Sequence, residues 1–76
     1  MLERLNIIDF RYRKENEDTL LGYNVITAQM YFFKGNVKAY IESLINNTPN
    51  IIVLENKYIN YLIDNNILIR SDNNEV

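Results

Sequence analysis

The N-terminal third of the chain alternates apolar and polar residues with the two-residue period of a β-strand. In residues 5–13, Ile8, Phe10 and Tyr12 alternate with charged residues, which predicts a strand with one buried face. The stretch that follows, Lys14 to Thr19, has no apolar residue and carries four charges. It is typical of a solvated hairpin loop rather than a cation site, because it lacks the spacing of a calcium-binding loop.

Two further strands are predicted before the first helix. Residues 20–26 resume the alternation, and Met30–Phe33 forms a short run of large apolar residues. Because the connections between the three strands are short, they predict an antiparallel meander. The residues of the second strand expected to share one face are Leu21, Tyr23 and Val25.

The clearest element in the pattern is a helix after the third strand. Gly35 interrupts the strand, Asn36 is a suitable N-cap, and Pro49 disfavours continuation of the helix before it. Between them the apolar residues recur at helical spacing and mark one buried face. These residues are Val37, Tyr40, Ile41, Leu44 and Ile45.

The rest of the chain predicts a second helix and a short return to the core. Residues 51–54 fit either a strand or a helical turn, with a preference for the helix. Helical spacing resumes from Glu55 to about Asn65, and Asn65-Asn66 is expected to turn the chain. Ile67, Leu68 and Ile69 should then pack on the core. Residues 70–76 are polar and are expected to fray.

Together these elements predict one α+β domain over residues 1–76. Its expected architecture is a three-stranded antiparallel meander followed by two or three helices, winged-helix-like. The length of 76 residues allows one modest core, and neither an internal repeat nor a linker divides it.

The composition excludes several classes of function but does not by itself identify one. The chain has neither cysteine nor histidine, which removes thiol chemistry and the commonest general base and metal ligand. We therefore expect no enzyme activity, no metal and no cofactor. Eight basic and ten acidic residues give a net charge of -2, which disfavours nucleic acid as a partner. The lack of cysteine, of a signal sequence and of a membrane-spanning run predicts a cytoplasmic protein.

One feature of the sequence points to binding. A strand with one solvated face should alternate, yet Met30–Phe33 is apolar on both faces. If this strand also lies at a sheet edge, it presents unpaired backbone groups beside apolar side chains, which peptide-binding modules use to accept another strand. The alternative is that other parts of the domain cover both faces.

Two tyrosines on the last helix add a second candidate surface. Tyr58 and Tyr61 are three residues apart and share a helical face beside Leu62. Tyrosine is common on binding surfaces, although it is also common at the boundary of a core. Lys57 lies next to them and is either a partner for an acidic ligand or a solvated side chain.

From Leu5 to Ile69 the chain resembles the PqqD-like domains, the precursor-recognition elements of ribosomal peptide natural-product pathways. The resemblance is carried by the aromatic strand Met30–Phe33, the Lys34-Gly35 junction, the helix centre Ala39-Tyr40-Ile41 and the stretch from Tyr61 to Leu68. The chain departs from the family between its helices, where the segment Asn46–Asn56 is shorter than usual.

The resemblance implies a function and a set of binding residues. Such domains take up the leader region of a precursor peptide as an added strand and deliver it to a peptide-modifying enzyme. The alternatives are a winged-helix DNA-binding protein and a regulatory homodimer formed through the same edge strand. The residues expected to bind the leader are Gln29, Met30, Tyr31, Phe32, Phe33, Lys57, Tyr58, Tyr61 and Leu62.

Overall fold

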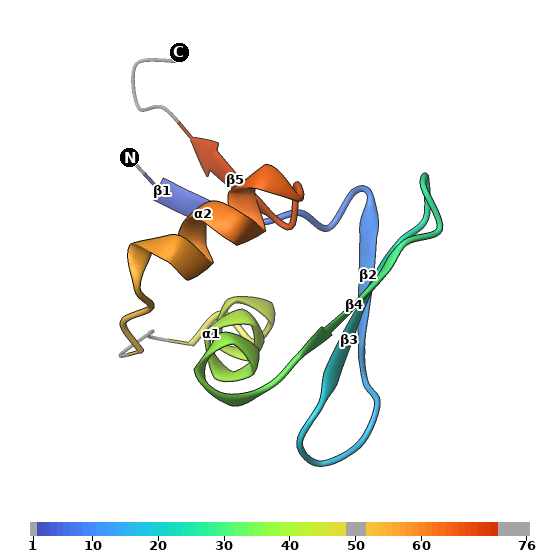
Figure 1. Ribbon diagram of the computed structural model, residues 1–76, viewed down its shortest axis with the longest axis horizontal. Coiled ribbons are helices and arrows are strands. Elements are labelled where there is room, and N and C mark those ends of the chain that lie inside the picture. The colour runs from blue at the N-terminus through green and yellow to red at the C-terminus, as the bar shows by residue number, and fades with distance from the viewer. Residues whose placement is uncertain (1, 49–51, 72–76) are drawn as a thin grey trace.

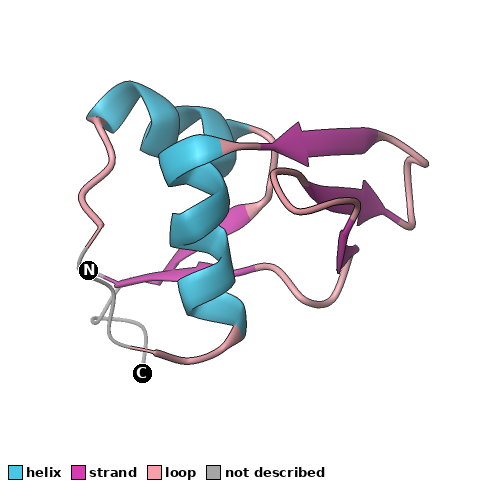
Figure 2. Ribbon diagram, turned by 90° about the horizontal axis from the view of Figure 1, so that it is seen from below, coloured by secondary structure: helices cyan, strands magenta, loops and turns pink. Residues whose placement is uncertain are grey.

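The computed structural model describes residues 2–48 and 52–71, which form an α+β arrangement of two antiparallel sheets and two helices (Figure 1). Both helices lie to the same side of the larger sheet. Figure 2, turned by 90°, shows the helices and this sheet on opposite sides of the molecule. In chain order the elements are β1 (Leu2–Leu5), β2 (Phe10–Lys14), β3 (Leu20–Asn24), β4 (Met30–Phe33), α1 (Gly35–Ile45), α2 (Asn56–Asp64) and β5 (Leu68–Ser71).

The larger sheet is the predicted meander, with strand order β2-β3-β4. Gly22 sits in the central strand opposite Tyr12 and Tyr31. A Cβ atom on Gly22 would lie 2.8 Å from Cε2 of Phe33, so the glycine makes room for that ring. The prediction of three antiparallel strands is confirmed, and β4 lies at an edge of the sheet.

The predicted first strand over residues 5–13 is confirmed for residues 10–13 and wrong before them, because the chain turns in its middle. Asn6 is buried, and its Oδ1 accepts hydrogen bonds from the backbone N–H groups of Ile8 and Asp9, each at 3.0 Å. This side-chain turn competes with strand pairing. It ends β1, starts β2 at Phe10 and leaves Ile8 exposed rather than on the buried face.

The second strand was predicted with the wrong inner face and the wrong end. Leu20, Gly22 and Asn24 are buried, whereas Tyr23 and Val25 of the predicted face are exposed; Leu21 of that face is buried. The strand stops at Asn24, whose Oδ1 accepts hydrogen bonds from the N–H groups of the next turn. A glycine and an asparagine on the inner face made the outer face look like the apolar one.

The helices agree with the pattern except at their beginnings. Helix α1 begins at Gly35, whose φ of 61° favours glycine, and the preceding cap residue is Lys34 rather than the expected Asn36. The helix ends at Ile45, and Asn47 has a left-handed φ of 55°. The predicted helical turn over 51–54 is wrong for residues 52–54, which form no regular secondary structure, while Pro49 and Ile51 lie outside the described residues.

A second sheet, which the sequence pattern did not predict, joins the two ends of the described chain. Strand β1 pairs antiparallel with β5, with Leu5 opposite Leu68 (Figure 1). Asn66 makes the predicted left-handed turn before β5, with φ 63°. Arg70 belongs to β5, so the expected frayed tail does not begin there, and residues 72–76 lie outside the described part.

The core lies between the inner face of the β2-β3-β4 sheet, the two helices and β5. Its buried members come from every one of these elements and from the connector before α2. Across the described residues, no helix has the length and apolarity that crossing a bilayer requires. The core residues are Phe10, Leu20, Phe33, Tyr40, Ile41, Leu54, Leu62, Ile67 and Leu68.

Candidate functional site

Strand β4 has one open edge, and two of its residues turn their backbone groups toward it. The N–H of Asn24 donates to the carbonyl of Gln29 at 2.9 Å, which fixes Gln29 as a residue that bonds toward β3. In an antiparallel ladder such residues alternate with residues that bond the other way. Met30 and Phe32 therefore direct their N–H and C=O groups away from β3, and no described strand pairs with them there.

The side chains of β4 divide between the core and the surface as the sequence predicted. Phe33 is buried and Tyr31 is half-buried, with their rings stacked at 6.4 Å between centroids. Met30 and Phe32 are each 58% exposed. The edge strand thus combines open backbone groups with exposed apolar side chains.

A narrow apolar groove lies between the end of β4 and α2. It encloses a cavity of about 160 Å³, to which β4, α1 and α2 all contribute. Tyr58 and Tyr61 reach it from α2 and remain partly exposed, while Leu62 is buried at its base. The full lining is Phe32, Phe33, Lys34, Val37, Tyr58, Tyr61 and Leu62.

Next to the cavity, a hydrogen-bonded contact joins β4 to the end of α2. The hydroxyl of Tyr31 donates toward Oε1 of Gln29 at 3.0 Å and lies 3.3 Å from Oδ1 of Asn65. Asn65 is the C-cap of α2, and its Nδ2 donates to the carbonyl of Tyr61 at 2.8 Å. The end of α2 is thereby held at a set distance from the edge strand.

A second, more polar hollow of about 350 Å³ continues the groove past α1. The two hollows share Lys34, Val37 and Tyr58. Lys34 and Glu55 place one charge of each sign in the second hollow. An extended ligand along this path would pass from apolar to polar surroundings.

Five of the nine predicted binding residues line the apolar cavity, and the other four lie around it. Gln29 and Tyr31 belong to the contact with Asn65. Met30 faces a separate hollow of about 350 Å³ on the outer face of the sheet. Lys57 does not line the cavity; its Nζ lies 4.0 Å from a Glu55 carboxylate oxygen and 5.1 Å from the Tyr58 ring centroid.

Two lining residues were missed, Lys34 and Val37. The sequence held a signal for each, because Lys34 follows the aromatic strand directly and Val37 begins the apolar stripe of the helix. The prediction that Val37 lies on the core-facing side of the helix is confirmed. The sequence did not show that the first turn of α1 also closes one end of the groove.

The opposite edge of the sheet, formed by β2, is partly occupied at its start. Nη1 of Arg11 donates to three backbone carbonyls beside β2, those of Ile7, Ile8 and Phe10, at 3.1, 3.3 and 2.9 Å. A charged side chain that occupies edge carbonyls is a common way to prevent strand addition. Among the described residues, β4 is therefore the less obstructed of the two edges.

Comparison with known proteins adds nothing to this geometry. No protein-family model, curated protein or solved structure matches the chain.

Proposed function

We propose that this protein binds the leader region of a ribosomally made precursor peptide as an added strand on β4 and presents it to a peptide-modifying enzyme in the cytoplasm. In this proposal the chain itself performs no chemistry and needs no cofactor. The observation that carries the proposal is the open edge of β4 directly beside an apolar groove. The sequence resemblance to PqqD-like domains points to the same two elements.

The geometry supplies both affinity and selection. A peptide strand can exchange hydrogen bonds with Met30 and Phe32, which gives binding with little dependence on sequence. Because side chains alternate along a strand, every second peptide residue would turn toward α2. An apolar cavity of about 150 Å³ accepts a benzene ring, so the hollow beside Phe33 and Tyr61 suits one large apolar anchor.

The winged-helix-like architecture is part of the same proposal. A three-stranded meander that leads into α1 and then α2 supports it. The absence of a helix at residues 52–54 agrees with the shorter segment between the helices in this chain. A DNA-binding role has less support, because α2 carries Lys57 as its single basic residue together with Asp64.

Calorimetry with a leader peptide tests the proposal directly. The probe is the N-terminal segment of a short precursor encoded beside this chain, with a scrambled peptide as control. Tyr61→Ala should weaken binding about tenfold or more, because one or two apolar anchors dominate small interfaces. Asp18→Ala, in the hairpin loop far from the groove, should leave the affinity unchanged.

A proline substitution separates strand addition from side-chain contact. Met30→Pro removes an N–H that points to the open edge and makes no ladder bond, and proline is tolerated at the first residue of an edge strand. It should abolish leader binding while Met30→Ala preserves it. Equal binding by both variants would exclude main-chain pairing at β4. A dimer of the free protein that Met30→Pro dissociates would instead assign the edge to self-pairing.

A further inference from the structure

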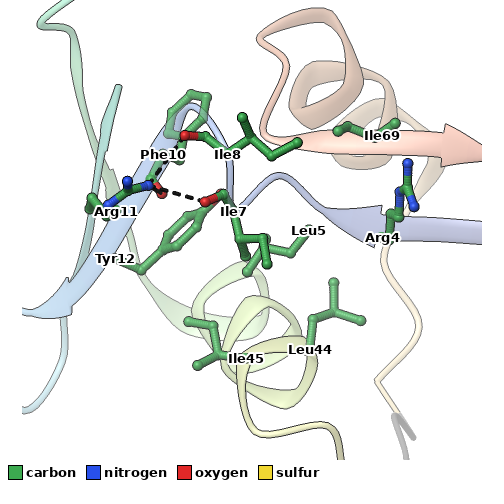
Figure 3. A pocket seen from close by; sticks show the side chains of 10 residues that line it. All are labelled: Arg4, Leu5, Ile7, Ile8, Phe10, Arg11, Tyr12, Leu44, Ile45 and Ile69. Atoms are coloured by element: carbon green, nitrogen blue, oxygen red, sulfur yellow. Dashed lines mark hydrogen bonds between the residues drawn. The ribbon is translucent and has the colours of Figure 1, made fainter. Parts of the chain in front are cut away.

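Another hollow lies on a different surface, between the β1–β2 turn, the end of α1 and β5. Its volume is about 700 Å³, and it shares no lining residue with the groove beside β4 (Figure 3). Figure 3 shows the side chains of α1 rising toward those of the β1–β2 turn. The apolar lining that matters here is Leu5, Ile7, Ile8, Leu44, Ile45 and Ile69.

The exposed isoleucines of this hollow are held in place by the fold. Ile7 and Ile8 are 71% and 75% exposed, although they sit in a hydrogen-bonded turn. Buried Asn6 fixes that turn: besides the two bonds to its Oδ1, its N–H donates to the carbonyl of Ile67 and its Nδ2 to that of Asn66, each at 2.9 Å. The hydroxyl of Tyr12 donates to the Asn6 carbonyl at 3.0 Å.

These contacts keep two isoleucines in water. Burying an isoleucine side chain is favourable by about 1.5–3 kcal/mol, so a rigid turn that exposes two of them marks a surface for another molecule. A small ligand is a poor match. Binding pockets for small molecules bury most of the ligand, whereas three walls of this hollow, Ile7, Ile8 and Ile45, are themselves exposed.

The charges of the hollow indicate the kind of partner. Arg4 and Arg11 lie on opposite sides of its apolar floor in Figure 3, and no aspartate or glutamate is among the lining residues. A second copy of the chain would bring four guanidinium groups together in a two-fold interface without a carboxylate to match them. A partner with acidic residues on either side of an apolar stripe complements the hollow.

The adjacent edge of the sheet determines the form of that partner. Arg11 already occupies the backbone carbonyls nearest the hollow, those of Ile7 and Ile8 in the turn and of Phe10 at the start of β2. This favours recognition through side chains, as when an amphipathic helix lies in an apolar groove. We propose that this hollow docks an acidic amphipathic helix of a second protein, independently of any peptide on β4.

Synthetic helices provide the test. One peptide of about 18 residues carries a leucine stripe flanked by glutamate, a second has lysine in place of each glutamate, and a third scrambles the stripe; this length supports a helix in water. The acidic peptide should bind most tightly, by about tenfold over the lysine peptide at low salt. The perturbed amide signals should cluster at Ile7, Ile8 and Ile45.

Matched variants locate the site. Ile8→Asp should weaken binding of the acidic peptide about tenfold or more, whereas Ile26→Asp, which changes an isoleucine 73% exposed in the β3–β4 turn, should not. Arg4→Glu should reverse the preference between the acidic and lysine peptides. Tyr61→Ala should leave both affinities unchanged, which separates this hollow from the groove beside β4.

Three results would overturn the proposal. The first is equal affinity for the acidic and lysine peptides, or no binding of either. The second is perturbation of amides beside β4 and α2 instead of the β1–β2 turn. The third is a dimer of the free protein, seen by sedimentation, that Ile8→Asp dissociates, since a second copy would then be the occupant.

Discussion

At the scale of single residues, Tyr12 connects the larger sheet to the turn that exposes the two isoleucines. Its hydroxyl donates to the Asn6 carbonyl, and burial raises the pKa of that hydroxyl above its ordinary value of 10.0. The neutral form is therefore favoured in the folded state. The stability that it contributes is complete below about pH 10 and is lost as the pH rises above that value.

Tyr12→Phe should lower the free energy of unfolding at neutral pH by about 0.5–1.5 kcal/mol, because one hydrogen bond is lost. Above about pH 10 the difference between the two proteins should shrink, since only the wild type has this hydroxyl to ionise. Urea titrations at neutral and alkaline pH measure both effects. A difference that stays constant into the alkaline range would show that Tyr12 ionises equally well when folded.

Single asparagines account for the parts of the chain that periodicity could not predict. Asn6 and Asn24 are buried, and each ends a strand by accepting two backbone N–H groups. Asn66 makes the left-handed turn into β5 and was predicted from residue type. The difference is physical: a left-handed turn depends on the residue itself, whereas a buried turn depends on distant groups such as the Asn66 carbonyl that Asn6 contacts.

At the scale of elements, the edge strand and α1 were well predicted because their patterns are local. Met30–Phe33 has the predicted bounds and its inner and outer faces are correct. The buried face of the central strand β3 was predicted wrongly because that face carries Gly22, which contributes no apolar side chain to the pattern. Its burial comes from the Phe33 ring packed against it, and such a contact cannot be read from β3 alone.

Gly22→Ala tests this contact between β3 and β4. The added methyl would lie 2.8 Å from a buried ring that has little room to move, so the variant should be less stable by about 1–3 kcal/mol. Because Phe33 also forms a wall of the groove, leader affinity should fall as well. Chemical denaturation and calorimetry measure the two effects. Unchanged stability would mean that the Phe33 ring can shift without cost and that this wall of the groove is not fixed.

At the scale of the whole molecule, α1 connects the two proposed binding surfaces. Val37 in its first turn lines the groove beside β4, and Ile45 at its end lines the hollow beside the β1–β2 turn. Eight residues of helix separate them by about 12 Å, so two partners could be held at once. Local patterns predicted the aromatic strand and the helix tyrosines that line the groove, but the hollow depends on the pairing of β1 with β5, which joins residues more than sixty positions apart.

Both surfaces depend on how firmly α1 is packed, and Ile41 is the residue that tests this. Its side chain is fully buried at the centre of the helix. A domain of this length has about 4–11 kcal/mol of stability in total. Ile41→Val removes one buried methylene and should cost about 0.5–1.5 kcal/mol, seen as a lower urea midpoint with an unchanged slope. The same change at exposed Ile26 should cost less than about 0.5 kcal/mol. Equal losses at the two positions would contradict the buried face assigned to α1, and with it the fixed placement of the two surfaces at its ends.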